Sequence, residues 1–119
     1  MILLALMAAT SANASPAAVV SQLVDRVHAG DQAGYAALAP DLRWEVADGL
    51  SVPATFKDMS MFVEGCAPFT LGEAQPAAVE GSMMVSAAAT CRDGGPKPMM
   101  FEFTVRDGKL LSFFVKEAN

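Results

Sequence analysis

The chain has 119 residues, of which 53% are hydrophobic and 18% charged. This composition fits a single folded domain and excludes an intrinsically disordered protein. The net charge of -5 and the pI near 4.6 argue against nucleic acid and anionic membranes as partners.

Residues 1–14 are typical of a cleavable export signal. Residues 2–9 form a short apolar run, and residues 12–14 form a small-x-small cleavage motif. The run is much shorter than the roughly 20 apolar residues that span a bilayer. The alternative is a buried N-terminal helix of the domain itself. We favour the signal, which predicts an exported protein, periplasmic or secreted, with one domain over residues 15–119 and no membrane contact after cleavage.

Three helices are predicted in the first half of the domain. The first spans residues 16–29, the second residues 31–38 and the third residues 55–65, where Thr55 and Asp58 resemble a capping box. The first helix carries its apolar residues on one face at helical spacing. These residues are Val20, Leu23, Val24 and Val27.

A strand is predicted between the second and third helices. Residues 41–47 alternate in polarity, which places Leu42, Trp44 and Val46 on one face. Residues 48–53 are expected to form a loop before the third helix.

The second half of the chain is predicted to be a series of strands. Alternating polarity indicates strands at residues 69–74, 77–92, 99–105 and 110–116, with a glycine as a point of interruption in the second. The Asp107-Gly108 pair favours a tight hairpin turn between the last two. Helices that precede a run of antiparallel strands are typical of an α+β fold. We therefore predict three helices packed on a curved antiparallel sheet.

The chain contains two cysteines, Cys66 and Cys91. An even number of cysteines in an exported protein favours a disulfide, although two buried free thiols are the alternative. Their spacing matches no metal-binding or redox motif, and no metal or cofactor is expected.

Four segments together resemble the nuclear transport factor 2-like superfamily, also called SnoaL-like or cone-shaped α+β proteins. They are the opening helix, the GDQAGYAALAPDLRWEV passage at residues 30–46, the third helix, and the MMFEFTVRDGKLLSFFV hairpin at residues 99–115. The resemblance covers nearly all of the domain. It implies a conical pocket between sheet and helices, binding of small apolar molecules, and dimerisation through the outer sheet face. Its enzymatic branches are isomerases, cyclases and dehydratases with a carboxylate base in the pocket.

The resemblance and the strand alternation together suggest a pocket lining without acids or bases. We expect the lining residues to be Trp44, Val46, Phe62, Phe101 and Phe103, with Phe114 as a further candidate. Glu45 and Glu102 alternate to the outer face.

Catalytic candidates are correspondingly few, because catalysis requires a titratable group that faces the pocket. Tyr35 and Asp48 are the candidates, although a packing role and a turn role explain them more simply. His28, the only histidine, follows Asp25 by one helical turn, which is more typical of a solvated surface pair than of a catalytic dyad.

The outer sheet face is expected to carry an apolar row suited to a homodimer. Its predicted members are Met84, Met100, Leu111, Phe113 and Val115. The sequence thus favours a non-catalytic domain that binds a small apolar ligand or acts as a dimeric interaction module. The alternative is an isomerase, cyclase or dehydratase acting on a small apolar substrate.

Overall fold

The computed structural model describes residues 15–66, 68–92 and 94–118. The expected export signal at residues 1–14 lies outside the described residues. None of the helices in the described ranges is long and apolar enough to cross a membrane.

The first two helices form where the sequence supplies capping residues. Helix α2 (Pro16–His28) begins at Ser15, whose hydroxyl accepts a hydrogen bond from the backbone N–H of Ala18 at 3.2 Å. Helix α3 (Gln32–Leu38) begins at Asp31, which caps it in the same way. The predicted apolar face of α2 is confirmed, since its inward residues are buried in the core.

Helix α4 (Phe56–Gly65) confirms the predicted capping box. The Thr55 hydroxyl accepts from the backbone N–H of Asp58 at 3.1 Å, and the Asp58 carboxylate accepts from the backbone N–H of Thr55 at 2.9 Å. Two otherwise unpaired backbone donors are thereby satisfied, which fixes where α4 begins.

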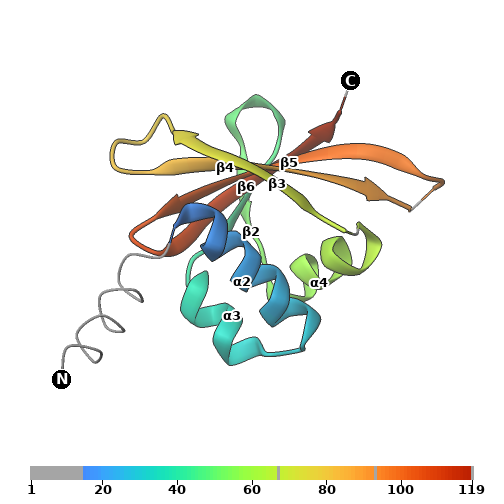
Figure 1. The fold of residues 1–119 in the computed structure, drawn as a ribbon, viewed down its shortest axis with the longest axis horizontal. Helices are drawn as coiled ribbons and strands as arrows, with labels where there is room; N and C mark the ends of the chain where they lie inside the picture. The colour runs from blue at the N-terminus through green and yellow to red at the C-terminus, as the bar shows by residue number, and fades with distance from the viewer. Residues whose placement is uncertain (1–14, 67, 93, 119) are drawn as a thin grey trace.

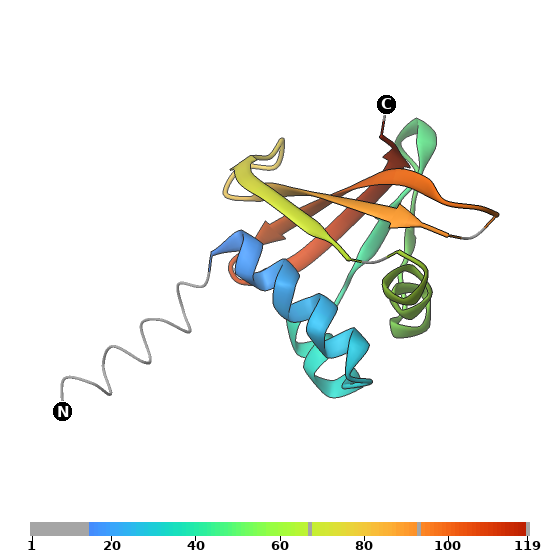
Figure 2. The same ribbon diagram turned by 45° about the vertical axis from the view of Figure 1, so that its right-hand side comes forward.

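The strands form one six-stranded sheet whose order is β2-β1-β6-β5-β4-β3. All neighbouring pairs are antiparallel except β1 with β6, which run parallel. The helices cover one face of this twisted sheet and leave the other uncovered (Figures 1 and 2). The strands are β1 (Arg43–Glu45), β2 (Ser51–Pro53), β3 (Thr70–Pro76), β4 (Met83–Cys91), β5 (Lys97–Arg106) and β6 (Lys109–Glu117). The predicted architecture of three helices on an antiparallel sheet is therefore largely confirmed.

Two local predictions around β1 are wrong. The strand predicted at residues 41–47 is only three residues long, and residues 51–53 of the expected loop form β2. The cause is a tight reversal between them, through a short 3-10 turn (Ala47–Gly49) in which Asp48 and Gly49 both have positive φ. The reversal turns the chain back early enough for β2 to pair with β1.

The predicted outer face of β6 is also wrong, because a β-bulge changes the alternation of side chains. Thr104 pairs with Ser112 while Val105 pairs with Leu110, so Leu111 is an extra residue in the register with β5. Beyond the bulge, Phe113 is fully buried in the core.

Val115 packs against the same core, so its predicted place in the outer row is also wrong. Phe114, which pairs with Glu102, takes the outward position instead. Met84 and Met100 alternate with the buried Val85 and Phe101 and remain on the outer face.

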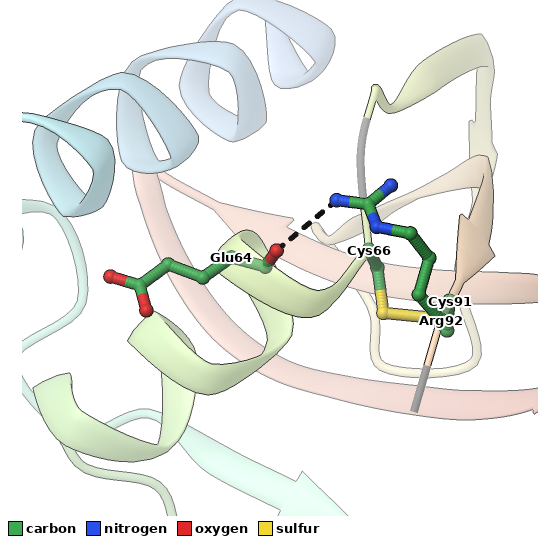
Figure 3. The surroundings of a disulfide bond; sticks show 4 residues. All are labelled: Glu64, Cys66, Cys91 and Arg92. Atoms are coloured by element: carbon green, nitrogen blue, oxygen red, sulfur yellow. Dashed lines mark hydrogen bonds between the residues drawn. A yellow bond between two sulfur atoms is a disulfide. The ribbon is translucent and has the colours of Figure 1, made fainter. Parts of the chain in front are cut away.

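The disulfide between Cys66 and Cys91 is present and joins the end of α4 to the end of β4 (Figure 3). The two residues also form an isolated antiparallel bridge. Their separation in sequence is 25 residues, and closing such a loop stabilises a fold by about 3 kcal/mol through the entropy of the unfolded chain. The bridge holds the C-terminal end of α4 against the sheet.

Because of the bulge at Leu111, we expect Phe113 and Phe114 to contribute unequally to the stability of the fold. We expect Phe113→Ala to lower the free energy of unfolding by about 3–5 kcal/mol, because it leaves a cavity in the core. The matched variant Phe114→Ala should cost clearly less than Phe113→Ala, because its side chain is only partly buried and lies on the face that the helices leave uncovered. Urea unfolding followed by circular dichroism measures both, and a larger loss for Phe114→Ala would contradict this register.

Candidate functional site

The side chains predicted to line a conical pocket pack mainly on one another. The indole of Trp44 meets the ring of Phe62 edge-on at 5.1 Å between centroids and stacks on Phe113 at 5.9 Å. Phe62 also meets Phe101 at 5.5 Å, and Phe101 stacks on Phe103 at 6.0 Å. We call these five residues the aromatic cluster.

Burial shows that the aromatic cluster is part of the hydrophobic core. Phe101, Phe103 and Phe113 expose none of their surface, and Trp44 and Phe62 are half-buried against them. Edge-to-face and stacked ring pairs contribute roughly 0.5–1.5 kcal/mol each beyond the area that they bury. The rings therefore occupy the space between helices and sheet where a ligand pocket was expected. Val46 follows β1 outside these ring contacts and is half-buried.

Tyr35 is held in the structure by packing. Its ring meets Phe56 edge-on at 5.3 Å, and its hydroxyl donates to the backbone carbonyl of Ala54 at 3.4 Å. Burial, with a smaller contribution from the carboxylate of Asp58, raises the pKa of Tyr35 to about 12. The phenol therefore stays protonated at physiological pH and acts as a hydrogen-bond donor that ties α3 to the segment before α4.

Asp48 is an exposed turn residue with φ of 66°. Asparagine and aspartate tolerate this left-handed conformation better than most residues, which explains aspartate at this position. Helix α3, which carries Tyr35, and the β1–β2 turn lie toward opposite ends of the molecule (Figures 1 and 2). The structure does not bring the two catalytic candidates together.

An open groove of about 510 Å³ lies at the edge of the helical layer, between α2, the end of α4 and the start of β3. We call it the rim groove. Apolar side chains in its lining come from α2, α4, β3 and the segment before β3. Polar side chains come from α2, α4 and the residue that follows β4. The lining residues are Ser21, Val24, Asp25, His28, Val63, Glu64, Pro68, Phe69, Leu71 and Arg92.

Among these residues, the sequence pointed only to Asp25 and His28, as a surface pair. Both are exposed on the last turns of α2, and both also line the rim groove. Glu64, Phe69 and Arg92 were missed. The available signal was the disulfide, because Cys66 and Cys91 stand close to these residues in the sequence and bring them together in space.

Arg92 forms the C-terminal cap of α4. Its guanidinium donates to the backbone carbonyl of Glu64 at 3.4 Å, and its backbone N–H donates to the carbonyl of Gly65 at 3.0 Å (Figure 3). A cation at this end of a helix also complements the helix dipole. Figure 3 shows the side-chain carboxylate of Glu64 extending away from Arg92.

The chemistry available in the rim groove is that of a binding site with polar edges. Val24, Val63, Phe69 and Leu71 offer an apolar surface, and the carboxylates of Asp25 and Glu64 are available as hydrogen-bond acceptors for a ligand. Within residues 15–66, 68–92 and 94–118, no group of three or more histidine, cysteine, aspartate or glutamate side chains is placed to hold a metal ion.

Comparison with solved structures identifies the fold. A steroid Δ-isomerase from Pseudomonas aeruginosa is 15% identical with a TM-score of 0.56, over 90% of this chain and 82% of that one. The epoxide hydrolase/cyclase-like enzyme SalBIII is 15% identical with a TM-score of 0.57, over 84% and 88%. RV0760c from Mycobacterium tuberculosis, solved with estradiol-17β-hemisuccinate, is 18% identical with a TM-score of 0.55, over 87% and 95%.

No protein-family model and no curated protein sequence matches the chain. At these low identities the structural likeness establishes the fold and leaves activity open. The arrangement of helices on a curved sheet and the structural neighbours agree with the expectation from sequence: this chain has the nuclear transport factor 2-like, or SnoaL-like, fold.

Proposed function

We propose that this protein binds a small apolar molecule in the rim groove without transforming it. The observation that carries the proposal is the groove itself, which joins apolar side chains from several elements in a volume of about 510 Å³. Small-molecule sites are commonly about 300–1,000 Å³ and apolar with a few polar groups. The proposal retains the expected ligand class but moves the site from the interior of the cone to its rim.

Two observations favour binding over catalysis. The aromatic cluster fills the interior in which enzymes of this fold class were expected to hold their substrate. Tyr35 and Asp48, the candidates for an isomerase, cyclase or dehydratase, are a packing residue and a turn residue. Among the structural neighbours are an isomerase and a protein solved with a steroid derivative, which makes steroids reasonable first probes.

A thermal-shift experiment with estradiol, dodecanoate and 2-naphthylmethanol tests the proposal. A ligand at about 100 times its Kd should stabilise the protein by about 2.7 kcal/mol. We expect Val24→Trp to abolish the shift, because Val24 lines the rim groove and an indole would occupy it. The matched control is Val79→Trp, because Val79 is 54% exposed and outside the groove lining.

The control variant should respond to ligand as the unmodified protein does. Absence of a shift with every probe would contradict the proposed function. A shift that survives Val24→Trp would contradict the proposed location.

The outer sheet face supports a second function, which is homodimerisation. Met84, Met100 and Phe114 lie on three neighbouring strands of the face that the helices leave uncovered. A salt bridge between Lys116 and Glu102, at 3.1 Å, lies on the same face. Apolar residues in adjacent strands with paired charges beside them suit a self-complementary interface between two copies.

Light scattering after size-exclusion chromatography measures this second function. We expect the unmodified protein to have the mass of a dimer and Met100→Asp to have that of a monomer, because the substitution replaces an apolar side chain of the interface by a carboxylate that loses hydration on burial. Met61→Asp is the matched control, because Met61 is 59% exposed on α4, on the helical side. A monomeric unmodified protein, or a dimer unaffected by Met100→Asp, would contradict this interface.

A further inference from the structure

We infer that the rim groove selects apolar molecules that carry a positively charged nitrogen. This inference rests on the proposed function and adds the charge of the ligand to it. Two features of the groove support it: two carboxylates in its lining and the C-terminal ends of two helices.

The carboxylates come from different helices. Asp25 lies on the last turn of α2 and Glu64 on the last turn of α4, and both line the groove. The carboxylate of Glu64 extends away from Arg92, whose guanidinium donates to the backbone carbonyl of the same residue (Figure 3). A ligand between the two helices therefore lies beside two negative charges.

The helix dipoles act in the same direction. α2 ends at His28, which lines the groove, and α4 ends one residue beyond Glu64. The C-terminus of a helix carries a partial negative charge equivalent to roughly half an electron, which favours cations. Two helices that end at one groove both favour a cationic ligand.

The basic side chains in the groove lining are Arg92 and His28. The guanidinium of Arg92 caps α4 and offsets part of the dipole of that helix. The net charge of -5 adds a long-range attraction for cations over the whole molecule. Phe69 supplies an aromatic ring in the lining, and aromatic rings attract cations held near their faces.

Three probes that share one apolar ring system separate the effect of ligand charge from that of ligand shape. They are 2-naphthylmethylammonium, 2-naphthylmethanol and 2-naphthoate, titrated into the full domain by calorimetry at about pH 8, above the usual range of histidine titration. We expect the ammonium probe to bind about fivefold more tightly than the alcohol, and the carboxylate probe to bind most weakly. The preference for the ammonium probe should weaken as salt is added.

Two double variants decide whether the groove carboxylates are responsible. Asp25→Asn with Glu64→Gln should bring the ammonium and alcohol probes to within about twofold of each other. Asp107→Asn with Glu80→Gln removes the same net charge from exposed turns outside the groove lining and should leave the preference intact.

The outcomes separate this inference from the proposed function. Equal binding of the ammonium and alcohol probes by the unmodified protein would overturn the charge selection while leaving the apolar site in place. A preference that survives the groove variant, or that disappears in the remote variant, would also overturn it. Failure of all three probes to bind would contradict the proposed function itself.

Discussion

The packing of aromatic rings between helix α4 and the sheet is the interaction on which the rest of this structure depends. Phe62 extends from α4 and meets Trp44 on β1, Phe101 on β5 and Phe113 on β6, each ring centroid within 5.1–5.6 Å of its own. One side chain thus ties a helix to β1, which precedes it in the sequence, and to both strands of the C-terminal β5–β6 hairpin. Because the rings interlock edge to face, the position of α4 is set by the core, and the disulfide fixes its end.

This packing also decides where a ligand could be held. The cone-shaped fold offers space between helices and sheet, but in this protein that space is taken by its own rings. The rim groove lies at the edge of that layer, where the disulfide brings Glu64 and Phe69 beside Arg92. A rim site joins apolar side chains to helix ends and charged groups, whereas an interior site would have been almost wholly apolar. The proposed preference for apolar ligands that carry a positive charge follows from that difference.

Much of the fold could be predicted from sequence because local signals agreed with each other. The capping box at Thr55 and the helical spacing of Val20, Leu23 and Val27 both describe interactions within one element. Which residues of β6 face inward could not be predicted, because the bulge at Leu111 depends on pairing with a second strand. The candidate site was harder still. Alternation showed that Trp44, Phe101 and Phe103 face inward, but it placed Phe113 on the wrong face, and only packing shows that the rings fill the interior.

The position of the ligand is the central claim, and mapping of backbone amide shifts by NMR tests it most directly. During titration with 2-naphthylmethanol, a ligand in the rim groove should produce the largest shifts at Val24, Glu64 and Leu71, which line that groove. The amides of Phe103 and Phe113, inside the filled core, should move little. Largest shifts at Phe103 and Phe113 would instead show that the interior opens to ligand, and would contradict a binding site at the rim.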